Sequence, residues 1–307
     1  MKHINRRYLL FIFLAIFAIY RIFWLCSAIV FIMLMYWSIN YVLKQIKINF
    51  IKKLCKGLFS ILILFFVVIC IRVFIVDIYL IPSLSMANTL YPKDVILVNK
   101  LIYGPNLPQS PYEIPLVNIF YFLKADSKNE FNYKVWQSKR LQGTSVIKQG
   151  DIVVFKKNEI RVKRCVAIAG DTLKMINGKI YTNNKLFKPS GKVKKDKANY
   201  SQIVLPKKGM QIPLTVESFK LYRSLLIMYE NVDIQDQNNN FYKNGKLIKN
   251  YVFERNYYFM LGDNRKDSRD SRNFGLIPEE DILGKVSCVL FSNKDGHFQW
   301  SRFLKGI

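Results

Sequence analysis

Two long apolar runs near the N-terminus limit what this chain can fold into. Residues 22–43 contain no charged side chain, and residues 57–76 are interrupted only by Arg72, near the end of that run. About 20 apolar residues cross the roughly 30 Å hydrocarbon core of a bilayer, so each run predicts a membrane-spanning helix. Residues 1–76 are therefore expected to form a membrane anchor.

The charges between the two runs predict an orientation. The segment 44–56 is expected to be a loop of 13 residues, and it carries five lysines and no acidic residue. The positive-inside rule places such a loop in the cytoplasm. Residues 77–307 would then lie on the outer face of the plasma (inner) membrane. A shorter apolar run, residues 8–20, leaves open whether the chain has two or three spans.

Composition argues against several classes of partner. Residues 1–76 hold ten of the 47 basic residues and none of the 21 acidic ones, and the remaining basic residues are scattered along the chain. No nucleic-acid motif, phosphate-binding loop or paired Cys and His pattern is present, so neither nucleic acid nor a metal or other cofactor is expected. Whether Cys165 and Cys288 form a disulfide remains open from the sequence.

Residues 77–307 predict a mainly β domain. β-Branched and aromatic runs at 94–100, 151–155 and 162–168 are typical of strands, and Asn-Gly pairs at 177–178 and 244–245 predict hairpins. A helix over residues 213–230 is expected to be capped by Thr215. Two insertions are expected, at 105–148 and 188–250. Residues 188–212 would end in exposed loops, and residues 235–240 would be a mobile turn.

A serine and a lysine are the first candidates for catalysis. The chain has two histidines, His3 and His297, so a Ser-His-Asp triad would have to use His297. A buried lysine whose pKa is lowered is another base that can activate a serine. Ser85 follows the membrane anchor closely, and Lys163 lies in a predicted strand. Alternation puts Arg161 and Lys163 on the same strand face, but does not show which face is buried.

Three ordered motifs around these residues resemble those of the bacterial type I signal peptidases, which use a Ser/Lys dyad. The resemblance covers most of residues 57–292. The motifs are Pro82-Ser83-Leu84-Ser85-Met86 followed by Thr89-Leu90; Gly150-Asp151-Ile152-Val153-Val154-Phe155 followed by Val162-Lys163-Arg164 and Gly170-Asp171; and Gly262-Asp263-Asn264-Arg265 followed by Ser268, Asp270-Ser271-Arg272 and Gly275.

The resemblance implies a role for each matching residue. Ser85 would be the nucleophile and Lys163 its general base. Ser83 would form the oxyanion hole together with the backbone N–H of Ser85, and Ser268 would hydrogen-bond to Lys163 and orient it. Supporting roles fall to an ion pair, Asp270 with Arg272, and to a turn containing Asp263 and Arg265. Shallow substrate pockets would be lined by Ile81, Pro82, Met86 and Val162.

The resemblance also implies the fold and the partners. It predicts a β-rich outer domain of two parts behind transmembrane α-helices, with an exposed hydrophobic surface that rests on the phospholipid membrane. The substrates would be signal peptides of exported preproteins, cleaved after small side chains. An inactive membrane-anchored binding protein, or a peptidase dedicated to one secretion or pilus system, are the alternatives.

Several positions depart from the family pattern, among them Lys266-Asp267 where the family commonly has Asp-Asn, and Ala169 where it has Pro. Arg161 stands where the family commonly has Tyr, and Phe274 replaces a usual Trp. A cation on the same strand face as Lys163 would lower the pKa of the lysine if it lay close, and would have no effect if it turned to solvent. The sequence leaves this open.

Overall fold

The computed structural model describes residues 23–115, 136–137, 139–189, 193–194, 197–232, 234–294 and 296–307. It divides into two compact units, one of residues 1–77 and 99–146 and the other of residues 78–98 and 147–307. Most of the insertion expected at 105–148 therefore belongs with the N-terminal helices. Contacts inside the first unit explain this grouping: Lys100 forms an ion pair with Asp77, and Trp24 Nε1 donates to the backbone oxygen of Gln142.

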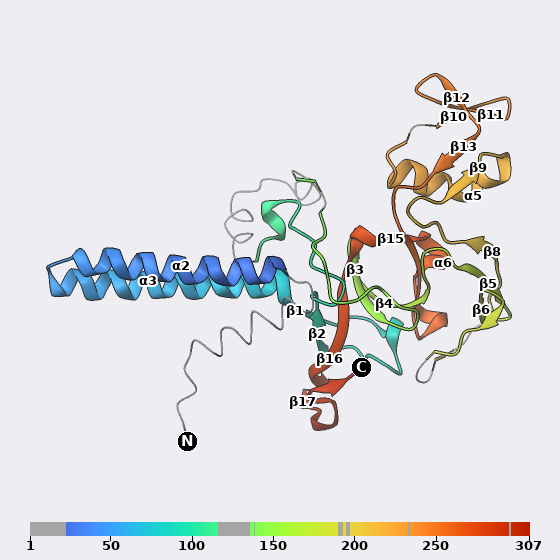
Figure 1. The fold of residues 1–307 in the computed structure, drawn as a ribbon. Coiled ribbons are helices and arrows are strands. Elements are labelled where there is room, and N and C mark those ends of the chain that lie inside the picture. The colour runs from blue at the N-terminus through green and yellow to red at the C-terminus, as the bar shows by residue number, and fades with distance from the viewer. Residues whose placement is uncertain are drawn as a thin grey trace, which may run out of the picture. The chain divides into compact units, whose positions relative to one another are not determined.

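The first unit contains two long apolar helices, α2 (Phe23–Gln45) and α3 (Asn49–Cys70), and α3 continues into a π-helical turn over Ile71–Ile75. They lie side by side as an antiparallel pair (Figure 1). Both are long and apolar enough to cross a membrane, over Trp24–Gln45 and Asn49–Ile75. No residue of α3 is buried by the rest of the described chain. A helix this apolar requires an apolar surrounding, which a bilayer supplies.

The prediction of a loop over residues 44–56 is wrong, because the observed connection is much shorter. Because α3 begins at Asn49, only residues 46–48 connect the two helices, and Lys52, Lys53 and Lys56 lie on the first turns of α3. Lysine and leucine favour helix, and no proline interrupts this stretch, so nothing in the local sequence prevents the helix from starting early. The third span proposed for residues 8–20 lies outside the described residues.

The second unit is β-rich, as predicted. Its largest sheet, among the described residues, has nine strands in the order β1-β2-β16-β3-β4-β14-β15, with β17 and β18 pairing with β16. These strands are β1 (Val76–Leu80), β2 (Asp94–Asn99), β3 (Ile152–Lys157), β4 (Glu159–Ala167), β14 (Tyr257–Leu261), β15 (Ile277–Pro278), β16 (Ile282–Lys294), β17 (His297–Phe298) and β18 (Lys305–Gly306). Strand β4 lies between β3 and β14, so both of its edges are paired.

Smaller elements make up the rest of the second unit. They are β5 (Thr172–Ile176), β6 (Lys179–Thr182), β7 (Lys185–Leu186), β8 (Tyr200–Val204), β9 (Gln211–Pro213), α5 (Val216–Met228), β10 (Ile234–Gln237), β11 (Asn240–Lys243), β12 (Lys246–Ile248), β13 (Asn250–Val252) and α6 (Ser271–Phe274). Both predicted Asn-Gly hairpins are present, between β5 and β6 and between β11 and β12. Thr215 caps α5 through a capping box with Ser218, which confirms the predicted helix start.

Residues 188–250 are more ordered than predicted. The segment expected to end in loops contains β8 and β9, and the run expected to be a mobile turn forms β10 and a tight turn. In that turn Asn238 and Asn239 both have positive φ, at 53° and 66°. Asparagine tolerates this conformation well, so a pair of asparagines closes a two-residue hairpin as Asn-Gly does.

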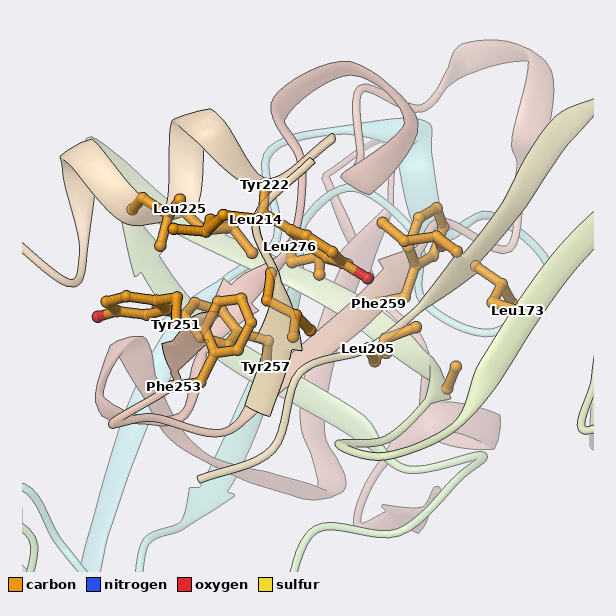
Figure 2. Packing of buried hydrophobic residues seen from close by; sticks show 14 of the residues in the cluster. Leu173, Leu205, Leu214, Tyr222, Leu225, Tyr251, Phe253, Tyr257, Phe259 and Leu276 are labelled. Carbon is orange, nitrogen blue, oxygen red and sulfur yellow. The ribbon is translucent and has the colours of Figure 1, made fainter. Parts of the chain in front are cut away.

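Two clusters of buried apolar side chains hold the second unit together. One packs α5 and the smaller strands against β14: Tyr222 of α5 lies edge-on to Phe253, at a centroid distance of 5.5 Å, and Phe253 contacts Tyr257 at 6.0 Å (Figure 2). The other lies beneath the segment after β1 and contains Ile81, Met86, Leu90, Ile96, Val98, Ile152, Val154, Val286 and Val289. The second cluster fixes the backbone that carries Ser85.

Candidate active site

Ser85 lies in a short helical turn directly after β1. The chain leaves the strand at Ile81, whose backbone exchanges hydrogen bonds with Asp94 and Lys93 at 2.8 Å, and then forms a 3₁₀ turn over Leu84–Met86. Ser85 and Met86 are buried, while Ser83 is exposed. On the other side, the backbone N–H of Asn264 donates to the backbone oxygen of Ser85 at 3.0 Å. The serine is therefore held from two elements.

Lys163 reaches Ser85 from the middle of β4. Its Nζ donates to Ser85 Oγ at 2.7 Å and to the backbone oxygen of Val162 at 3.1 Å. Ser83 Oγ lies 3.2 Å from Ser85 Oγ. In the part of the chain that the structure describes, the side chains that hydrogen-bond to Ser85 Oγ are those of Lys163 and Ser83. The structure thus brings together three residues that the sequence motifs singled out.

The surroundings of Lys163 favour the neutral amine. The residue is only 4% exposed, and burial is the main reason why its pKa falls from 10.5 to about 8. Asp270 and Asp263 oppose this shift, whereas Arg161 adds to it. A lysine with a pKa near 8 is partly deprotonated at neutral pH, which is the form a general base requires.

Asp270 and Arg272 form the predicted ion pair. Arg272 Nε donates to Asp270 Oδ1 at 2.8 Å, and the carboxylate is fully buried. Asp270 also accepts from the backbone N–H of Gly262 at 3.1 Å and caps helix α6. Arg272 continues the network by donating to the backbone oxygen of Arg265 at 2.7 Å. This pair therefore fixes the shape of the turn between β14 and α6.

Asp263 has partners that the sequence did not reveal. Its carboxylate accepts two hydrogen bonds from Arg164, at 2.9 and 2.7 Å, and one from Thr89 Oγ1 at 2.5 Å. Arg265, which was expected to share the turn with Asp263, donates from Nε to the backbone oxygen of Gly262 at 2.8 Å. Lys163 and Arg164 point to opposite faces of β4, yet each is 4% exposed. Alternation could not predict this, because both faces of the strand are covered.

Ser268 does not form the predicted bond to Lys163. Among the described residues its Oγ is buried with no hydrogen-bond partner. The side chain instead lies against Gly262, where an added Cβ would be only 2.1 Å from Ser268 Oγ and 2.5 Å from the backbone oxygen of Ser85. Gly262 is thus needed so that the turn can approach the nucleophile segment closely.

The four residues expected to line substrate pockets differ in their accessibility. Ile81 and Met86 are 3% and 1% exposed and belong to the second core cluster, and Val162 packs against the same cluster. Pro82 is exposed. Ile81 and Met86 therefore support the floor of this region, while Pro82 and Val162 leave surface for a ligand.

The remaining sequence candidates lie outside the dyad. Cys165 and Cys288 are both free, so no disulfide links them, and burial raises the pKa of Cys165 above its usual range. His297 is exposed on β17. Within the described residues no three His, Cys, Asp or Glu side chains are grouped as metal ligands.

Comparison with known proteins identifies the family. The sequence model of the family "Signal peptidase, peptidase S26" matches residues 51–291. The chain is 33% identical over 276 residues to signal peptidase I of Buchnera aphidicola subsp. Schizaphis graminum, covering 80% of this chain and 77% of that protein. The chain belongs to the signal peptidase family S26.

Other relatives and one solved structure are also similar. Signal peptidase I of Aquifex aeolicus is 28% identical and covers 78% of this chain and 85% of its own length, and that of Pseudomonas aeruginosa is 28% identical and covers 78% and 72%. A crystal structure of a signal peptidase I from Enterococcus faecalis is 17% identical and covers 45% of this chain and 95% of its own, with a TM-score of 0.24. That score is too low to support a conclusion about the fold.

Replacing Arg164 with methionine should destabilise the second unit strongly. The change leaves the Asp263 carboxylate, which is fully buried, without its cation. Breaking a buried pair in this way costs about 3–5 kcal/mol of the free energy of unfolding. The measurement is urea-induced unfolding in detergent, monitored by circular dichroism.

Arg255→Met is the matched control. Arg255 lies 3.7 Å from Glu280, and both side chains are 31% exposed, so its loss should cost only about 0–1 kcal/mol. Equal losses for the two variants would show that the Arg164–Asp263 pair has no special importance for stability.

Proposed function

We propose that Ser85 and Lys163 carry out the peptidase reaction of this signal peptidase, the cleavage that removes the N-terminal signal peptide from an exported preprotein. The observation that carries the proposal is the 2.7 Å contact between the buried Lys163 Nζ and Ser85 Oγ. A nucleophile and a base within hydrogen-bond reach, in a family of peptidases, match the requirements for acyl transfer.

The proposed reaction begins with Lys163 in its neutral form. The amine accepts the proton of the Ser85 hydroxyl while Oγ attacks the scissile carbonyl, which gives a tetrahedral intermediate and a Lys163 ammonium. The ammonium then protonates the leaving amine of the mature protein as the C–N bond breaks, leaving the signal peptide as an ester on Ser85. Water, deprotonated by the regenerated amine, hydrolyses the ester and releases the signal peptide.

Ser83 is placed to stabilise the negative charge of the intermediate. Its hydroxyl lies 3.2 Å from Ser85 Oγ, so it can donate to an oxygen that develops beside the nucleophile, together with the backbone N–H of Ser85. Asp270 and Arg272 would hold the turn that carries Ser268 and Gly262. Pro82 and Val162, over the floor made by Ile81 and Met86, would favour small substrate side chains.

Substitution of the dyad should abolish cleavage of a preprotein that carries an Ala-x-Ala signal peptide. Ser85→Ala removes the attacking oxygen and Lys163→Met removes the base while keeping an apolar chain of similar length, so each should lower the rate by about 10⁴-fold or more. Ser83→Ala should lower kcat by about 10²-fold, because it removes one oxyanion donor. The assay uses the full chain in detergent.

Retained folding is the control for this series, measured as an unchanged thermal midpoint. Undiminished cleavage by the Lys163→Met protein would rule out the Ser/Lys mechanism. A wild-type chain that cut no signal peptide would instead favour an inactive binding protein or a peptidase with dedicated substrates.

We further propose that the β-rich unit lies on the outer face of the membrane. The short connection between α2 and α3 and the adjoining turns carry Lys44, Lys47, Lys52, Lys53 and Lys56, which favours the cytoplasmic side for this end of the helix pair. Trypsin added to intact spheroplasts should therefore cleave the β-rich unit and leave the helix pair protected. Cleavage of the β-rich unit only after the membrane is opened would show the opposite orientation.

An exposed aromatic cluster supports contact between the β-rich unit and phospholipid. Phe298 contacts Trp300 at a centroid distance of 4.7 Å and Phe303 at 5.9 Å, and these three side chains are 42%, 77% and 49% exposed. Phe291 extends this aromatic patch and is 42% exposed. Soluble surfaces rarely leave so many neighbouring rings uncovered, and Trp is favoured at membrane interfaces.

A double substitution, Trp300→Ser with Phe303→Ser, should separate membrane contact from catalysis. In proteoliposomes it should slow cleavage of a membrane-inserted preprotein by about tenfold or more, because two rings no longer bury apolar surface in lipid. Cleavage of a soluble peptide should be unchanged. Leu221→Ser with Met228→Ser, which changes two exposed side chains of α5, should affect neither substrate. Equal losses on both substrates would argue against lipid contact by the patch.

A further inference from the structure

Arg161 is a cation held beside the proposed general base. It lies two residues before Lys163 on β4, and therefore on the same face of the strand. Its NH1 donates to the backbone oxygen of Arg269, at 3.5 Å, in the turn that carries Ser268 and Asp270. The Arg161 side chain is 20% exposed, so it does not extend freely into solvent. The guanidinium thus joins the lysine strand to the turn between β14 and α6.

An aromatic ring keeps the guanidinium in this position. The guanidinium carbon of Arg161 lies 5.4 Å from the centroid of the Phe274 ring, within the range of a cation–π interaction. Phe274 in turn contacts Phe155 at 6.1 Å, and Phe155 is the cross-strand partner of Arg161 in the pairing of β3 with β4. Residues from three elements therefore restrict the arginine.

The other charged groups that act on Lys163 are carboxylates. Asp270 and Asp263, from the turn after β14, and Glu159, from β4, each favour its ammonium form, whereas Arg161 favours the neutral amine. Glu159 forms an ion pair with Arg161 but is 66% exposed, so water screens much of its charge. The effect of Arg161 on Lys163 is larger than that of Glu159.

We propose that Arg161 is a positioning residue for the peptidase reaction, and that its guanidinium, held over Phe274, keeps Lys163 in the neutral form that can accept the proton of Ser85. The inference rests on the proposed role of Lys163 as general base. Arg161 makes no contact with the reacting atoms in this role. It acts through the lysine, by repelling a second positive charge.

The test is the pH dependence of kcat/KM for a soluble Ala-x-Ala peptide, from about pH 6 to about pH 10, with the full chain in detergent. In the wild type, activity should rise as the pH passes the pKa of Lys163, near 8, because the amine loses its proton. Arg161→Met removes the neighbouring positive charge, so the pKa of Lys163 should rise. The acidic limb of the profile, the pH range over which activity rises, should then move to higher pH by about half to one unit.

Two further variants test whether the effect depends on charge. Arg161→Lys keeps the cation and should leave the limb near its wild-type position. Glu159→Gln removes an exposed carboxylate with little risk to folding and should move the limb to lower pH, the opposite direction. An unmoved limb in Arg161→Met would overturn the proposal, whatever Glu159→Gln shows.

Lys157→Met is the matched control for packing. Lys157 Nζ also lies 5.3 Å from the centroid of the Phe274 ring and donates to the backbone oxygen of Phe274, but it is not among the charges that act on Lys163. A shift in this variant equal to that of Arg161→Met would mean that the ring, not the charge, causes the effect, and would overturn the proposal. A wild-type profile without an acidic limb would instead overturn the role of Lys163 itself. Activity of the Lys163→Met protein without such a limb would do the same.

Discussion

The buried carboxylate of Asp263 is the interaction on which the geometry of the site depends. It binds Arg164 of β4 through two hydrogen bonds and Thr89, which follows the Ser85 turn, through a third. Three segments that are far apart in sequence thus meet at one side chain. Removing a carboxylate from water costs free energy, and well-placed partners must offset that cost. The carboxylate therefore selects one arrangement of these segments. In that arrangement the nucleophile and the lysine meet.

The same arrangement explains how a lysine can be buried beside a serine. Burial of an amine favours its neutral form, and the 2.7 Å contact with Ser85 Oγ then satisfies it with a hydroxyl, not a counter-ion. Gly262 allows this packing, because any side chain there would collide with Ser268 and with the backbone of Ser85. Ser268 therefore has a packing contact that the sequence could not show, and the hydrogen bond expected of it is absent from this arrangement.

The sequence predicted features that depend on local pattern. The apolar runs gave two helices, the Asn-Gly pairs gave hairpins, and Thr215 marked the start of α5, because each is decided by residues close in the chain. The start of α3 was missed because a lysine-rich stretch suits both a loop and a helix. The strands β8 and β9 were missed because they depend on distant partners: β8 pairs with β5, and β9 pairs with β13.

The site residues also divide into those predicted from local sequence motifs and those that depend on distant partners. Ser85 and Lys163 were found because the motifs around them resemble those of a known family, whereas Arg164 was passed over although it is adjacent to Lys163. Alternation assigns the two residues to opposite faces of β4, and one of these faces would ordinarily be exposed. Here the strand is covered on both faces, and the partner of Arg164 lies 99 residues further along the chain. Such a pairing depends on tertiary structure.

The distribution of charge shows why no carboxylate of the described residues forms an ion pair with Lys163. Two buried carboxylates act on Lys163 from the turn after β14, and each has an arginine partner: Asp263 binds Arg164, and Asp270 binds Arg272. A carboxylate already paired with arginine attracts a second cation less than an unpaired carboxylate does, since the field of the pair falls off faster than that of a single charge. The lysine therefore lies near two paired carboxylates, and desolvation has the largest effect on its pKa. These two arginines thus have two consequences: they fix the turn and the strand, and, in the part of the chain that the structure describes, they leave the amine of Lys163 without a counter-ion.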